Sequence, residues 1–228
     1  MEGIPVFFKT CAAAAAIAMI AGSAAADVWI AEEAPAWRGD EGAAHYRWES
    51  FTSASAAEGP NFPTNEAWPS GDALLFNFAD GAFVSGEGNI YGFGGPLNIH
   101  TYLYADADVQ EVVLNVSTLG SEIDYSSLML AWTTGDGGNE GMLFGEVSMN
   151  YWEEIDFGQG VGALVNASWS FDLSSIADDV REIGLIFQGS GAHMSLDAVG
   201  VDILTAVPAP GVLSLAALAG LAFRRRRR

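Results

Sequence analysis

The chain of 228 residues has a single cysteine, Cys11, and only three histidines. With no second cysteine, the chain can form no internal disulfide, and its body beyond Cys11 has no thiol for a metal site or a nucleophile. His45, His100 and His193 lie far apart and lack the spacing of a zinc motif. No Gly-x-Ser-x-Gly elbow and no internal repeat occur. These absences argue against thiol, zinc and serine-elbow chemistry.

Positive charge is scarce, and the formal net charge is −20. Lys9 and the terminal arginines account for six of the nine basic residues, whereas Glu2 is the only one of the 29 acidic residues in those two ends. Residues 27–206 therefore carry a net charge of about −25. Nucleic-acid binding is excluded because it needs a basic footprint. The charge favours cation binding or a matrix cross-linked by divalent ions, and solubility in saline surroundings explains it equally well.

Residues 1–26 have the pattern of a secretory signal peptide. Lys9 precedes the apolar stretch Cys11–Ala21. The small residues Ala24, Ala25 and Ala26 then fit the cleavage rule of signal peptidase. We expect the enzyme to cut between Ala26 and Asp27. A buried N-terminal helix is the alternative. The mature body would begin at Asp27.

The C-terminal 22 residues, 207–228, have three parts in a fixed order. A proline-rich break is followed by an apolar run, Val212–Phe223, and a basic end. The break is Val207, Pro208, Ala209, Pro210, and the end is Arg224, Arg225, Arg226, Arg227, Arg228. A helix over 211–223 would be about 20 Å long, short against a bilayer core of about 30 Å. The arginines would remain on the cytoplasmic side.

This order of parts resembles the sorting signal of PEP-CTERM proteins in a Val-Pro-Ala-Pro variant, with Ala209 where the usual motif has glutamate. The resemblance implies an exosortase that cuts near Val207–Pro210, in bacteria that make an extracellular polysaccharide. The body would be anchored transiently in the inner membrane and then sent to the cell surface or outside the cell. A plain C-terminal anchor is the alternative.

Residues 27–206 show short alternating segments between turns rich in Gly, Asn, Asp and Pro, which predicts one all-β domain, a β-sandwich of about eight to ten strands. The expected strands are 46–53, 74–78, 98–104, 109–118, 128–132, 142–151, 162–167, 169–173, 183–187 and 193–204, with one helical turn in 174–180. The segment Ala192–Ile203 resembles the last strand of carbohydrate-binding jelly rolls, where Leu-Asp-x-Val closes the sheet. The fold class is thus a single jelly-roll-like sandwich between a signal peptide and a short transmembrane sorting helix.

One segment, 154–159, resembles the Glu-x-Asp-x-x-Glu strand of family 16 glycoside hydrolases, which are jelly rolls. The resemblance makes Glu154 the nucleophile and Asp156 its helper, and strand alternation puts both on one face. Gln159 stands where the acid/base belongs and cannot donate and recover a proton. We therefore expect no enzyme activity and no catalytic residues.

Calcium is the one ion that the acidic loops suggest, because it takes six to eight oxygen ligands. The candidates are Asp136, Asn139 and Glu140 in one loop and Asp197 on the final strand, although a solvated turn explains the loop as well. We expect no other cofactor.

Several aromatic residues suit sugar binding, because aromatic faces stack on the apolar faces of sugars. His100, Tyr102 and Tyr104 share one face of an expected strand, while core packing accounts for most other rings. The sequence thus predicts an exported, non-catalytic surface or matrix protein associated with exopolysaccharide. The alternatives are a module that recognises a specific glycan and a degenerate hydrolase.

Overall fold

The structure, a computed structural model, describes residues 33–65, 71–158, 160–176 and 179–207. The predicted signal peptide and its cleavage residues, and the sorting signal from Pro208 onwards, lie outside these residues. Val207 is described and is 43% exposed. Within the described part, no helix is long and apolar enough to cross a membrane.

The described residues form twelve strands and one short 3-10 helix, so the chain is all-β, as predicted, with more strands than the eight to ten expected. The elements are β1 (Ala43–Trp48), η1 (Ala56–Glu58), β2 (Ala73–Asn77), β3 (Ala82–Val84), β4 (Ile90–Gly92), β5 (Asn98–Tyr104), β6 (Val109–Gly120), β7 (Ile123–Thr134), β8 (Glu140–Leu143), β9 (Glu146–Asp156), β10 (Val161–Asp172), β11 (Val180–Gly189) and β12 (Met194–Thr205).

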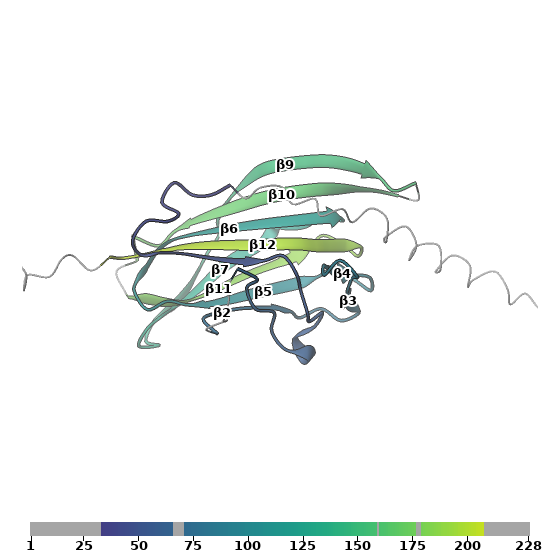
Figure 1. The fold of residues 1–228 in the computed structure, drawn as a ribbon. Helices are drawn as coiled ribbons and strands as arrows, with labels where there is room; N and C mark the ends of the chain where they lie inside the picture. Colours follow the sequence, from purple (N-terminus) through teal and green to yellow (C-terminus); the bar gives the residue numbers. More distant parts are fainter. Residues whose placement is uncertain (1–32, 66–70, 159, 177–178, 208–228) are drawn as a thin grey trace, which may run out of the picture.

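Two antiparallel sheets form the layers of a β-sandwich (Figure 1). Sheet A has the order β3-β4-β12-β6-β10-β9, and β1 also pairs with β12. Sheet B has the order β2-β5-β11-β7-β8. Most strands that are neighbours in a sheet are distant in sequence, for example β12 beside β6 and β11 beside β5. The pairing of β1 with β12 joins the first and the last strand of the domain.

Alternation explains the core. On β6, Val112, Leu114 and Val116 point inward, and the facing strand β11 contributes every second residue in the same way. The largest fully buried side chains include Trp48 and Trp169. The indole Nε1 of Trp48 donates to the backbone oxygen of Asn61 over 3.1 Å, so its polar atom is satisfied in the core.

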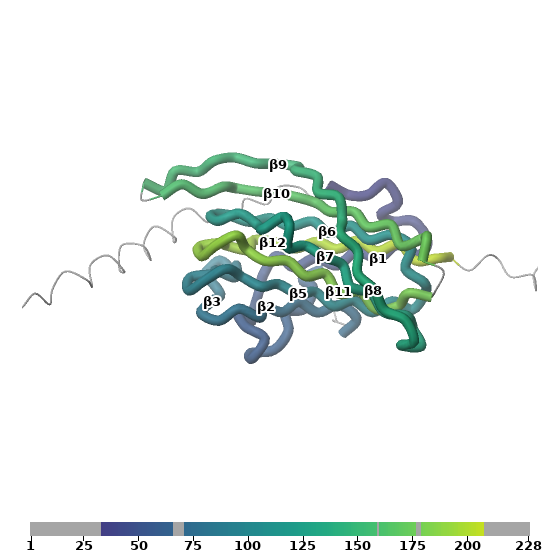
Figure 2. The backbone as a smooth tube through the Cα atoms, turned by 180° about the vertical axis from the view of Figure 1, so that it is seen from behind, coloured from purple at the N-terminus to yellow at the C-terminus, as the bar shows by residue number. Residues whose placement is uncertain are grey.

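The strand predictions were right in type but missed several boundaries. The strand expected at 98–104 is confirmed with the same limits as β5. The single strand expected at 142–151 is two strands, because the chain crosses from β8 in sheet B to β9 in sheet A (Figure 2). Gly145 lies at this crossing, where a Cβ atom would come within 2.8 Å of the Phe171 ring.

Two other boundaries differ. The strands expected at 162–167 and 169–173 form one continuous strand, β10, because Ala163, Val165, Ala167, Trp169 and Phe171 keep one alternation throughout. Between the strands expected at 74–78 and 98–104 the structure also has β4, which pairs with the start of β12. Of the expected helical turn, residues 174–176 are described, and they form a turn closed by a hydrogen bond from Ile176 N to Leu173 O.

Candidate functional site

The outer side of sheet B carries a group of aromatic rings. On β5, His100, Tyr102 and Tyr104 point outward, since Ile99, Thr101 and Leu103 between them are buried. On the neighbouring strand β2 the same alternation turns Phe76 outward, opposite His100. Phe78 follows directly after β2 and is 48% exposed. We call these five residues, Phe76, Phe78, His100, Tyr102 and Tyr104, the aromatic face.

Ring contacts hold the aromatic face in place. The ring centroids of Phe78 and His100 are 4.6 Å apart, and those of Phe76 and Tyr102 are 6.0 Å apart in an edge-to-face arrangement. Nδ1 of His100 lies 3.1 Å from the hydroxyl oxygen of Tyr102, and its Nε2 lies 3.2 Å from Oδ1 of Asn98. Burial lowers the pKa of His100, which favours the neutral ring. The rings therefore form an ordered surface.

Two small residues, Gly184 and Ala131, lie beside the aromatic face. Tyr102 pairs with Gly184 on β11, and Gly184 pairs in turn with Ala131 on β7. A Cβ atom at Gly184 would lie 3.8 Å from both the Tyr102 ring and the Ala131 side chain, so the backbone does not require glycine here. The two small residues leave the flank of the Tyr102 ring open for a flat ligand.

Polar side chains border the rings. Glu182 on β11 pairs with Tyr104 at one end, and Gln188 pairs with Asn98 at the other. Both side chains on β11 are exposed. The rings are tilted against one another, by 68° between Phe76 and Tyr102 and by 55° between Phe78 and His100. Exposed rings with hydrogen-bonding groups at their margins have the composition of a sugar-binding surface, because a sugar ring has apolar faces and a rim of hydroxyl groups.

The residues that resemble a hydrolase strand lie elsewhere, on β9 at the edge of sheet A. Glu154 and Asp156 share one face of this strand, as alternation predicted. Both are exposed, and Oδ1 of Asp156 accepts a hydrogen bond from the Gly158 backbone within the turn to β10. Gln159 lies outside the described residues.

Glu154 borders an open cavity of about 210 Å³ beside strands β9 and β10 of sheet A. The cavity is lined by Trp152 and Glu154 of β9, the start of β10, the β6–β7 turn and Ser190. Trp152 is 48% exposed. The fold brings Glu122 and Ser190 to Trp152 from two turns, and nothing in the sequence pattern indicates this proximity.

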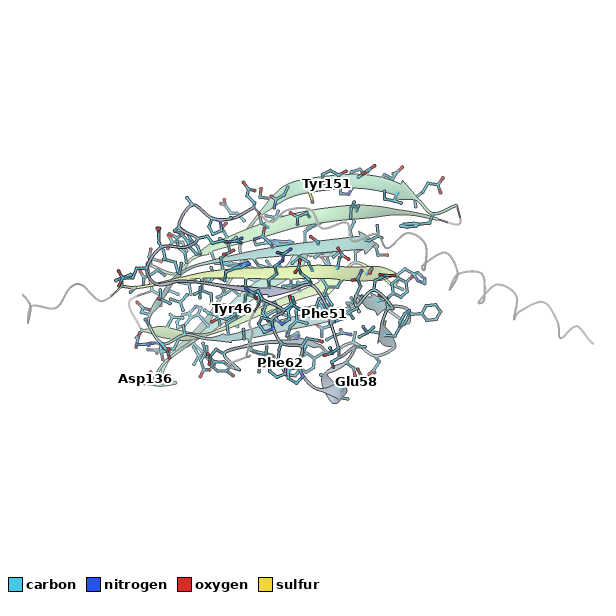
Figure 3. The ribbon with its side chains drawn as sticks, in the orientation of Figure 1. Tyr46, Phe51, Glu58, Phe62, Asp136 and Tyr151 are labelled. Atoms are coloured by element: carbon cyan, nitrogen blue, oxygen red, sulfur yellow. The ribbon has the colours of Figure 1, made fainter. Side chains whose placement is uncertain are left out.

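The candidate calcium ligands do not come together as one group. Asp136, Asn139 and Glu140 lie in and just after the β7–β8 turn of sheet B. Asp136 lies at one end of the sandwich (Figure 3). Oδ1 of Asp136 accepts hydrogen bonds from the Thr134 hydroxyl and the Gly138 backbone, which lowers its pKa. Asp197 is on β12 in sheet A, where Nδ2 of Asn89 donates to it over 2.6 Å.

The structure assigns local partners to the other two histidines. Nδ1 of His45 lies 3.1 Å from Oδ1 of Asp202, and Nδ1 of His193 lies 3.0 Å from the Tyr91 hydroxyl. In the described ranges, no three His, Cys, Asp or Glu side chains cluster in a way that would hold a metal ion.

Asp202 on β12 is fully buried, and sequence reasoning gave it no structural role. Its two carboxylate oxygens accept from Nε and Nη2 of Arg38 at 2.6 and 2.5 Å. This pair fastens the segment before β1 to the outer side of sheet A. The sequence carries no signal for this pair, because Arg38 and Asp202 are 164 residues apart and many other acidic side chains are present.

The chain matches no protein-family model and no curated protein.

Proposed function

We propose that the protein is an exported, non-catalytic component of the cell surface or extracellular matrix that binds polysaccharide through the aromatic face. Its body would be a jelly-roll-like sandwich. The observation that carries the proposal is the exposure of ordered rings on the outside of sheet B, beside the open flank at Gly184. Aromatic rings left in water on a rigid strand pair are typical of ligand-binding surfaces.

The delivery part of the proposal rests on the two ends of the sequence. Signal peptidase would remove residues 1–26, and exosortase would cut near Val207–Pro210 after a transient stay in the inner membrane. The acidic charge restricts the ligand, because a body with about 25 excess negative charges repels anionic polymers. Neutral or cationic glycans are therefore the expected partners.

A glycan array probed with the full chain tests the binding part. We expect neutral oligosaccharides to be retained and Phe78→Ala to weaken binding about fivefold, since stacking on an exposed ring contributes on the order of 1 kcal/mol. Phe83→Ala is the matched control, because Phe83 is 46% exposed and also contacts another ring, Tyr91, but lies on β3 of sheet A. Equal losses in both variants, or no retained glycan, would refute the aromatic face.

The delivery part has its own measurement. Replacing Arg224–Arg228 with serine should leave the tail uncut, and the intact mass of the protein from its native cells reports both cuts. A wild-type mass that still includes Arg228, in the inner membrane, would show a simple anchor in place of a sorting signal.

A further inference from the structure

The cavity beside β9 has features that the aromatic face lacks. Trp152 and Glu154 reach it from the same face of β9, and Ser121, Glu122 and Ser190 reach it from the turns at the ends of β6 and β11. It is open to solvent, and its volume of about 210 Å³ is below the roughly 300 Å³ at which pockets for drug-sized ligands begin. A single small ring or a short chain fits this space.

The polar side chains that line the cavity present acceptors. The hydroxyl of Ser121 donates its proton to the Ala192 backbone oxygen, and that of Ser190 donates to the Glu122 backbone oxygen over 2.9 Å. Each hydroxyl therefore has only lone pairs left for a ligand. The Glu122 carboxylate accepts from the Tyr125 hydroxyl over 2.8 Å and can accept more.

Glu154 adds a second carboxylate, and it makes no hydrogen bond or ion pair with any residue that the structure describes. Among the described side chains that line the cavity, the indole N–H of Trp152 is the one donor left for a ligand. A ligand that satisfies these two carboxylates and two hydroxyl oxygens must bring several N–H or O–H donors and positive charge. An ammonium group has three donors, and its charge is attracted to the face of an indole ring.

We propose that this cavity binds the protonated amino group of an amino sugar in a glycan. The sugar ring would lie against the exposed Trp152 ring, and the ammonium group would contact Glu154 and Glu122. The inference rests on the proposed function in taking the ligand to be a glycan, but it uses a separate site on the other sheet. The net charge of −20 attracts such a ligand from a distance.

The test compares two sugars that differ only at nitrogen. Titration calorimetry with the full chain uses a glucosamine oligomer and the N-acetylglucosamine oligomer of the same length, at about 0.15 M salt, where charges are screened beyond roughly 8 Å. We expect at least about tenfold tighter binding of the glucosamine oligomer, and a loss of about tenfold in Glu154→Gln and in Trp152→Ala.

The adjacent residues on the opposite face of β9 supply matched controls. Glu153→Gln removes the same charge one residue away, and Tyr151→Ala removes a ring that is 38% exposed. Both should stay within about twofold of the parent protein, because neither residue lines the cavity. Equal losses in Glu153→Gln and Glu154→Gln would show attraction by the general negative field and overturn the site.

Two further outcomes also decide. Equal binding of the acetylated oligomer would overturn the role of the ammonium group, and equally tight, Glu154-dependent binding of a lysine peptide would overturn the sugar. The proposals for the two sites can be refuted independently of each other. If Phe78→Ala weakens glycan binding while the cavity variants do not, the cavity proposal is wrong and the proposed function stands; the reverse pattern refutes the aromatic face alone.

Discussion

The inner faces of the two sheets are both apolar, but their outer faces differ in which side chains are buried. On the outside of sheet A, a stripe of small polar side chains is buried, with exposed fractions from 0 to 7% for Asn115, Ser117, Asn166 and Ser168. On the outside of sheet B, the rings of Phe78 and Tyr104 are 48% and 46% exposed. The polar residues are thus hidden and the aromatic ones are in water, the reverse of the usual preference.

Hydrogen bonds explain why sheet A tolerates Ser117, Asn166 and Ser168 in its buried stripe, whereas Oδ1 of Asn115 has no hydrogen-bond partner among the described residues. Nδ2 of Asn166 donates to the Ser117 hydroxyl at 2.8 Å, and Nδ2 of Asn150 donates to Oδ1 of Asn166 at 3.0 Å. Buried polar groups are tolerated when they are paired in this way. Sheet B has no comparable reason to expose rings, so its aromatic face is the better guide to function. The comparison shows that the burial of a polar side chain is explained by its hydrogen bonds, whereas an exposed ring without such an explanation points to a ligand.

The largest effect is expected for Asp202→Ala on the outer side of sheet A. The change removes the buried acceptor of the Arg38 guanidinium, a carboxylate whose Oδ1 also lies 3.1 Å from Nδ1 of His45, and we expect the free energy of unfolding to fall by about 2–3 kcal/mol. Urea denaturation measures it. Glu146→Ala, an exposed acid on the same side of the sheet, should change stability by less than about 0.5 kcal/mol. Similar values for both would contradict the structural role of Asp202.

On sheet B, Gly184→Val should separate stability from binding. Valine favours strands, and its Cβ has ordinary contact distances, so the urea midpoint should stay the same or rise. The side chain would fill the open flank of Tyr102 and weaken neutral glycan binding by about tenfold in the same array. Gly86→Val is the control, because nothing lies within 4 Å of a Cβ there and the residue is in a turn. Undiminished binding by Gly184→Val would place the ligand elsewhere.

The smallest effect concerns pH. Burial lowers the pKa of His100 in the folded protein, so the unfolded chain binds the proton more readily. Its contribution to stability is fully present above the unfolded pKa of about 6.5 and is lost as the pH falls from there through the lower folded value. His100→Phe keeps a ring next to Phe78 and Tyr102 but removes the titration. Urea midpoints of both proteins at pH of about 7.5 and 6 should show a smaller acid loss in the variant.

In that comparison His45 and His193 are present in both proteins and cancel. An acid loss as large in His100→Phe as in the parent would show that His100 is not desolvated on the aromatic face.

Parts of both sites could be predicted from the sequence. The period of two placed His100, Tyr102 and Tyr104 on one face of one strand, and it placed Glu154 and Asp156 together on another. Phe76 and Phe78 could not be assigned to the same surface, because β2 meets β5 across two intervening strands. The break at Gly145 was missed for a similar reason, since the Phe171 ring that requires it comes from β10.

The sequence by itself determined the all-β class, the acidic body without internal disulfides, and which side chains share a strand face, because alternation is a local property of the backbone. Only the tertiary structure decided which faces are covered. Pairing of distant strands buried the Asn166 stripe and Asp202, left the rings of sheet B in water, and brought Glu122 and Ser190 to Glu154. Burial depends on what packs against a face, and those partners are fixed by contacts far apart in the chain.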